Sequence, residues 1–310
     1  MREKYGLYEM FKTPELAVEV TLQPVKAFEV DAAIIFADIL LPLEGMGIKL
    51  EFVDGEGPVI HNPVRTAEHV AALRVPDPEE HLSYVLSSLR WARAELNDRI
   101  PLIGFAGAPF TLASYMIEGG ASRNFLLTKK LMYEAAPAWH MLMNKLEQTL
   151  SAYLLAQVRA GAQVIQVFDS WVGCLGPADY REYVHPHTKK LFDAIREAQI
   201  PTIHFGTGTA DLLPLMREAG GEVLGVDWRT HLDEAWNRIG SKTGIQGNLD
   251  PVTLMAPRPI LQARAKEILD RAAGRAGHIF NLGHGILPST PVDSIKALVA
   301  FVHEYSAGSD

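Results

Sequence analysis

The chain has 310 residues, of which 48% are hydrophobic and 21% charged, a composition that excludes a disordered or fibrous protein. Its net charge of −8 argues against a general nucleic-acid binder, which needs a basic surface. The single cysteine, Cys174, excludes an internal disulfide and a metal site made of several thiolates. No apolar run approaches the roughly 20 residues of a membrane span, and no signal-peptide core follows Met1. We therefore expect a cytoplasmic protein that does not enter a membrane.

Short apolar runs alternate along the chain with longer stretches of helical spacing. Each run is apolar on both faces, as in a parallel strand that helices cover. One helical stretch, 14–28, precedes the first run, and prolines mark this and several later helix starts. The predicted strands are 31–36, 101–105, 163–168, 201–205, 222–226, 243–247 and 278–282, and the clearest later helices are 78–97, 130–160, 178–199, 257–273 and 291–306.

This alternation predicts an α/β protein with one domain of β-α units over residues 1–310. A (β/α)8 barrel of the TIM type has eight strands and begins with a strand. Only seven runs are present, and residues 1–13 contain no apolar run that could serve. We therefore expect a (β/α)8 TIM-type barrel whose first strand is missing from this chain. A seven-stranded fold is the alternative.

Polar residues at the ends of the predicted strands outline a candidate active site, because barrel enzymes place their active sites at the C-terminal ends of the strands. Asp38, Ser170 and His284 each come within two residues of a strand end, and Tyr115 lies ten residues beyond another. Glycines flank His284 on both sides, which allows the backbone to approach a neighbour closely. These four residues form the predicted site.

Each candidate also has a purely structural interpretation. An aspartate after a strand often caps the next helix, which could explain Asp38. Ser170 could belong to a turn, and Tyr115 could be a core tyrosine with a bonded hydroxyl. His204 lies inside a predicted strand, so we expect it to be buried and hydrogen-bonded. The capping interpretation is stronger for three other aspartates, Asp169, Asp227 and Asp250.

Six motifs that run in order through the chain resemble the uroporphyrinogen decarboxylase family. The resemblance implies a (β/α)8 barrel, usually a homodimer, that acts in haem and tetrapyrrole biosynthesis. It implies a carboxy-lyase that converts the four acetate side chains of uroporphyrinogen to methyl groups, giving coproporphyrinogen, with no metal or organic cofactor. The motifs are 36–40 (FADIL), 104–112 (GFAGAPFTL), 115–120 (YMIEGG), 168–170 (FDS), 247–251 (GNLDP) and 281–285 (NLGHG).

The resemblance also implies roles for individual residues. Asp38 matches a carboxylate aimed at the pyrrole N–H groups, which would stabilise a cation formed when a pyrrole carbon is protonated. Catalytic roles are thus implied for Asp38, Tyr115 and His284, and substrate-binding roles for Arg2, Phe105 and Ser170.

One family feature is missing, an Arg-Gln-Ala-Gly-Arg stretch at the end of the first strand, whose arginines meet the substrate's carboxylates. The substrate carries eight carboxylates, so the loss matters in a chain of net charge −8. We expect little or no activity from the 310-residue chain, and activity from a longer form if an upstream start exists.

Two other functions stay open. A cobalamin-dependent methyltransferase of the same superfamily would bind zinc through His and Cys ligands, which Cys174 alone supplies poorly. A non-catalytic porphyrinogen-binding protein is the second alternative, although such a protein has no need of Asp38, Tyr115 and His284.

Overall fold

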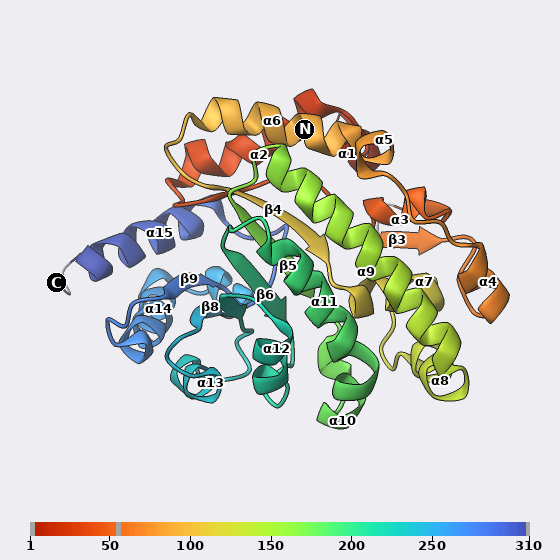
Figure 1. Cartoon of the computed structure of the whole chain (residues 1–310). Helices are drawn as coiled ribbons and strands as arrows, with labels where there is room; N and C mark the ends of the chain where they lie inside the picture. The colour runs from red at the N-terminus through yellow and green to blue at the C-terminus, as the bar shows by residue number, and fades with distance from the viewer. Residues whose placement is uncertain (1–3, 54–56, 308–310) are drawn as a thin grey trace.

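Seven parallel strands form one curled sheet in the computed structural model, which describes residues 4–53 and 57–307. Their order across the sheet follows their order in the chain, and Figure 1 shows them at the centre with helices around them. This arrangement is that of an α/β barrel of the TIM type, so the predicted fold class is confirmed. The strands are β1 (Ala33–Ile34), β4 (Leu102–Gly107), β5 (Val164–Asp169), β6 (Thr202–Gly206), β7 (Val223–Gly225), β8 (Gly244–Leu249) and β9 (His278–Leu282).

The alternation of side chains along β5 separates the interior of the barrel from its outer face. The ring of Phe168 contacts those of Phe105 and Phe205 on the neighbouring strands, with centroids 5.6 and 5.9 Å apart. Asp169 follows directly and points to the opposite face, because successive strand side chains alternate. It is fully buried there. Aromatic rings therefore line the interior, while the outer face is sealed by helices.

Helices cover that outer face. The long helix α9 (Ala136–Arg159) packs against β4 and β5. Helix α2 (Pro14–Phe28) coincides with the predicted 14–28 stretch and begins with a proline, whose missing N–H is not needed at that position. The other helices are α1 (Leu7–Lys12), α3 (Leu41–Gly45), α4 (Ala67–Ala72), α5 (Pro78–His81), α6 (Ser83–Leu96), α7 (Pro109–Glu118), α8 (Leu126–Glu134), α10 (Pro177–Asp179), α11 (His185–Arg196), α12 (Leu213–Ala219), α13 (Leu232–Ile239), α14 (Arg258–Ala272) and α15 (Val292–Ala307), with a π-helical turn at Tyr180–Val184 and 3-10 turns at Val172–Cys174 and Pro251–Met255.

A small antiparallel hairpin was not expected from the sequence. Strands β2 (Leu50–Val53) and β3 (Gly57–Ile60) pair with each other and not with the main sheet. Each has four residues that are mostly half-buried. Such short strands carry no apolar run and no clean alternation, so the pattern that revealed the barrel strands does not reveal them.

The main sheet has two free edges, β1 and β9. Across residues 4–53 and 57–307, neither strand pairs with a second strand on its outer side. Ile34 in β1 and Ile279 in β9 are each 42% exposed, although both lie in strands of the main sheet. The described residues that precede α2, from 4 to 13, contain helix α1 and no strand. The described sheet is thus an open barrel of seven strands.

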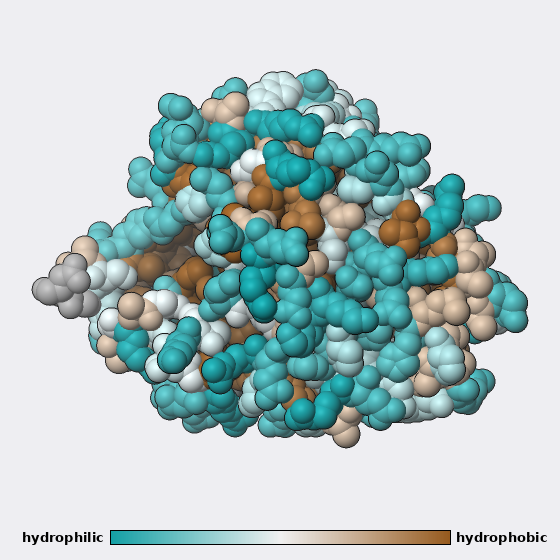
Figure 2. Space-filling model, in the orientation of Figure 1, coloured by the Kyte–Doolittle hydropathy of each residue, from teal (hydrophilic) through white to brown (hydrophobic). Residues whose placement is uncertain are grey.

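Helix α15 lies near the free edge at β9. It packs mainly on α14 and reaches α2, and only Leu298 of its residues is buried. Figure 2 shows hydrophobic side chains in a hollow beside this helix, on a face that is otherwise mostly hydrophilic. None of the helices in the described ranges is both long and apolar enough to span a membrane.

Candidate active site

Asp38 follows β1 and carries a strongly perturbed carboxyl group. One carboxylate oxygen, Oδ1, accepts a hydrogen bond from the backbone N–H of Leu40 at 2.8 Å. This bond lowers the pKa, but desolvation of the half-buried group outweighs it and raises the pKa to about 6. This local bond closes a turn and does not cap α3, whose N-cap residue is Leu40, so the capping interpretation of Asp38 is wrong. Desolvation of a carboxylate costs free energy, however, and such groups gather at functional sites.

Tyr115 lies near enough to Asp38 for the charge of that carboxylate to act on it. It belongs to α7, the helix that begins directly after β4. Burial, and then the negative charge of Asp38, raise the pKa of its hydroxyl to about 12. Its ring stacks on the indole of Trp171, with centroids 3.8 Å apart and planes 27° apart. The stack therefore fixes the orientation of the Tyr115 ring, and the hydroxyl keeps its proton near neutral pH.

Ser170 comes directly after β5, in a loop held from two sides. Its carbonyl accepts a hydrogen bond from Thr207 Oγ1 at 2.5 Å. A Cβ on Gly173 would lie 2.1 Å from the carbonyl oxygen of Thr207, so only glycine permits this approach. Because Ser170 precedes Trp171, the loop brings it to the same part of the site as Tyr115.

A row of aromatic rings runs across the barrel interior from Phe105 to His284. Phe105 contacts Phe168, and Phe168 contacts Phe205. Phe205 in turn meets the imidazole of His284 edge to face, with centroids 6.5 Å apart. The row gives the site an apolar wall that reaches from β4 to the loop after β9.

His284 is partly exposed just after β9, and a hydrogen bond from the backbone of the next residue to its ring defines its tautomer. The N–H of Gly285 donates to His284 Nδ1 at 2.7 Å, so in the neutral ring the proton sits on Nε2. Partial burial, and then the cation of Arg229, lower the pKa of the imidazole. The ring is therefore neutral near pH 7 and presents Nε2–H as a donor.

Arg229 and Trp228 belong to this part of the site but were not predicted to. Asp227, at the end of β7, accepts from Gly208 N at 2.8 Å and from the guanidinium of Arg229. That guanidinium lies 4.3 Å from the centroid of the Trp228 ring. The signal that could have found them is their position directly after β7, where barrel enzymes place functional side chains.

The remaining predictions have mixed outcomes. Asp250 caps a 3-10 turn by accepting from Val252 N at 2.9 Å, as expected. His204 is fully buried with Nδ1 3.3 Å from the carbonyl of Gly220, also as expected. Asp169 caps no helix and instead accepts from the hydroxyl of Thr111. Arg2 lies outside the described residues.

The site consists of two groups of residues. Asp38, Tyr115 and the loop of Ser170 form one group, and His284 and Arg229 belong to the other. Within residues 4–53 and 57–307, no hydrogen bond or ring contact joins His284 directly to Asp38 or Tyr115. The aromatic row connects the two groups, so a ligand that touched both would lie across it.

Neither a metal site nor a reactive thiol is evident in the part of the chain that the structure describes. No three His, Cys, Asp or Glu side chains in that part are grouped so that they could hold a metal ion. Burial raises the pKa of the partly buried Cys174 thiol to about 11, so it stays protonated near neutral pH.

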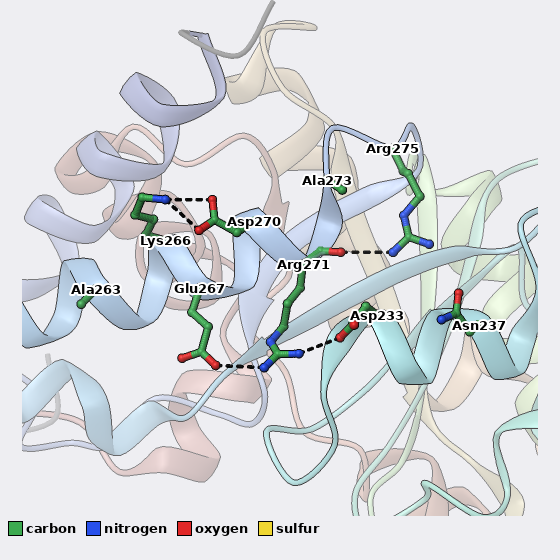
Figure 3. A pocket seen from close by; sticks show the side chains of 9 residues that line it. All are labelled: Asp233, Asn237, Ala263, Lys266, Glu267, Asp270, Arg271, Ala273 and Arg275. Carbon is green, nitrogen blue, oxygen red and sulfur yellow. Dashed lines mark hydrogen bonds and ion pairs between the residues drawn. The ribbon is translucent and has the colours of Figure 1, made fainter.

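A surface cleft between α13 and α14 lies apart from these residues, and its charges are already paired. Figure 3 shows Arg271 between Asp233 and Glu267, at 2.9 and 3.1 Å, and Lys266 on Asp270 at 2.7 Å. These are helix residues and not strand-end residues. Exposed ion pairs of this kind add little to the stability of the fold. They also leave few unpaired cations for an anionic ligand.

Solved structures with similar folds include a methyltransferase and a methionine synthase. A methyltransferase from Methanosarcina mazei matches with a TM-score of 0.82 and 22% identity, covering 96% of this chain and 87% of that one. A B12-independent methionine synthase from Shewanella sp. W3-18-1 matches with a TM-score of 0.64 and 10% identity, covering 95% and 88%. At these identities the likeness shows the fold alone.

Sequence relatives are far more similar. The family model described as uroporphyrinogen decarboxylase matches residues 1–305. A protein of that name from Roseiflexus sp. is 56% identical over 312 residues, covering 99% of this chain and 90% of the relative. One from Carboxydothermus hydrogenoformans is 56% identical over 307 residues, covering 99% and 88%. The chain therefore belongs to the uroporphyrinogen decarboxylase family.

Proposed function

We propose that the protein is a carboxy-lyase of tetrapyrrole biosynthesis that removes the carboxyl groups of the four acetate side chains of uroporphyrinogen to give coproporphyrinogen. Family membership supports the reaction. The observation that carries the proposal is the desolvated carboxylate of Asp38 beside Tyr115, at the strand ends of a barrel. A carboxylate in such a place is suited to face a developing positive charge.

The chemistry needs such a group. Each acetate loses CO2 and gains a proton, and the electrons of the broken C–C bond need a sink. Protonation of a pyrrole carbon makes the ring itself that sink. The ionised carboxylate of Asp38 would accept hydrogen bonds from the pyrrole N–H groups and stabilise the transient cation. Preorganised groups of this kind are typically worth about 3–4 kcal/mol each.

The other candidates would bind the side chains of the substrate. Neutral His284 presents Nε2–H as a donor to a carboxylate, and Tyr115 keeps its hydroxyl proton for the same purpose. Ser170 would contribute a hydroxyl from the loop after β5. The ring of Phe105 would pack against a pyrrole as part of the apolar wall. Arg2 is proposed to bind a carboxylate from the family resemblance alone.

Further proposals concern the state of the protein. From the family resemblance we propose a homodimer in the cytoplasm, one barrel domain per chain and no cofactor. We also propose that the 310-residue chain turns over slowly, because eight substrate carboxylates need more cations than the described site offers. Arg229 is the cation beside His284, and it is already paired with Asp227.

The test is an anaerobic assay with uroporphyrinogen, with products oxidised to porphyrins and separated by chromatography. The 310-residue chain is compared with a form extended by any in-frame sequence upstream of Met1, and with Asp38→Asn in the more active form. Coproporphyrin formation that Asp38→Asn abolishes supports the proposal. Robust turnover by the 310-residue chain would refute the proposal that it turns over slowly. Tight binding without turnover in every form would favour a porphyrinogen-binding protein instead.

A further inference from the structure

A buried polar chain on the outer face of the sheet leads from Asp169 to the candidate site. The side chain of Asp169 is fully buried, and Thr111, in the first turn of α7, is also fully buried. Thr111 Oγ1 donates its hydrogen to Asp169 Oδ1 at 3.0 Å. A carboxylate is a stronger hydrogen-bond acceptor than a neutral group, so this bond fixes the direction in which the hydroxyl hydrogen points.

The same hydroxyl holds the loop after β5. A hydroxyl has one hydrogen and two acceptor lone pairs. With its hydrogen given to Asp169, the oxygen of Thr111 accepts from the backbone N–H of Trp171 at 3.3 Å. The carbonyl of Ser170, one residue earlier, is held by Thr207. The peptide between Ser170 and Trp171 is therefore tied at both of its polar groups.

Asp169 itself is confined by the residues behind it. Its second oxygen, Oδ2, lies 3.8 Å from His204 Nε2, and both side chains are fully buried. His204 is oriented in turn by the carbonyl of Gly220 and by the ring of Phe192, 4.9 Å away between centroids. The carboxylate thus has little room to move away from Thr111.

We infer that Asp169 and Thr111 are positioning residues, which hold the indole of Trp171 and through it the ring of Tyr115. The hydrogen bond from the Trp171 N–H to Thr111 fixes the backbone from which the indole extends. The indole then stacks on the ring of Tyr115, with centroids 3.8 Å apart. The role in catalysis rests on the function proposed for Tyr115. The geometric part, that the hydroxyl at 111 sets the Trp171–Tyr115 stack, stands by itself.

The experiment uses Thr111→Val, which keeps the shape but removes the hydroxyl, with Thr111→Ser as its matched control. The near-ultraviolet circular dichroism of the stacked pair is isolated by subtracting the spectrum of Trp171→Phe, because the chain has 5 tryptophans. Thr111→Val should lose most of this band and lower kcat about tenfold or more, since small misplacements have large kinetic effects. Thr111→Ser should restore both.

A purely structural role would give a different result. If Thr111→Val kept the band and the wild-type kcat and only lowered the melting temperature, the inference would be overturned. Thr111→Ala, which adds no bulk, replaces Thr111→Val should that variant not fold, with the same expectations. The dichroism is read without substrate, so a lack of decarboxylase activity in both the 310-residue chain and its extended form would refute the proposed function while the band still decides the geometric inference.

Discussion

The backbone of Gly283 lies directly against that of Trp228. A Cβ at position 283 would come within 2.7 Å of the Trp228 nitrogen, whereas one on Gly285 would meet nothing within 4 Å. Gly283→Ala should therefore displace the loop that carries His284 and lower the free energy of unfolding by about 1–3 kcal/mol, as overpacking does. Chemical denaturation measures this, with Gly285→Ala as the matched control. Equal effects of the two changes would contradict the explanation.

Asp38→Asn should stabilise the protein while it abolishes the proposed activity. Because burial raises the folded-state pKa from 3.8 to about 6, the stability that protonated Asp38 contributes is full at low pH and is lost as the pH rises through about 6. At pH 7 the asparagine variant should be more stable by about 1–3 kcal/mol, and near pH 4 the difference should vanish. Urea denaturation at both pH values tests this.

The control for that experiment is Asp250→Asn, a change of another strand-end aspartate that keeps the oxygen accepting from Val252 N. A loss of stability for Asp38→Asn at pH 7 would mean that the carboxylate is a needed structural group. Asp38 would then be a turn-forming residue first, and its proposed electrostatic role would lose its main support.

The pH dependence of the proposed reaction should reflect the same carboxyl group. Asp38 must be ionised to face a cation, so kcat/KM should rise with pH and level off above about 6. The lowered pKa of His284 keeps that ring neutral over the plateau. The rate should not fall through loss of the Tyr115 proton until far above neutral pH, since its pKa is about 12. A profile that falls from pH 5 to 7 would contradict this assignment.

Tyr115→Phe removes the hydroxyl and keeps the ring that stacks on Trp171. If the hydroxyl donates to a substrate carboxylate, kcat/KM should fall about 10- to 100-fold, the range expected for a hydrogen bond to a charged group. The free energy of unfolding should change little, because the ring stays in place. Tyr133→Phe, which removes the more exposed hydroxyl bonded to Asp179, is a control that should leave kcat/KM unchanged.

The barrel was predictable because most of its strands are buried on both faces and read as apolar runs, as the overlap of the predicted 201–205 with the wholly buried β6 illustrates. The close approach of the backbone beside His284 was predictable from its glycine neighbours, and Gly283 makes that approach. Trp171 was not, because the partner that an indole stacks on depends on how α7 and the β5 loop meet in space. Arg229 was missed for a similar reason, since its pairing with Asp227 is set by the turn after β7.

The two free edges of the described sheet should differ from its centre in how fast their backbone amides exchange. Asp38 follows β1 and His284 follows β9, so these two residues stand on the two outermost strands of the open barrel. No strand within residues 4–53 and 57–307 spans the interval between them, and α15 there buries only Leu298. The amide hydrogens of β1 and β9 should exchange faster than those of the doubly paired β5. A ligand that contacts both Asp38 and His284 should slow amide exchange at both edges together, because it would link the two edge strands to each other.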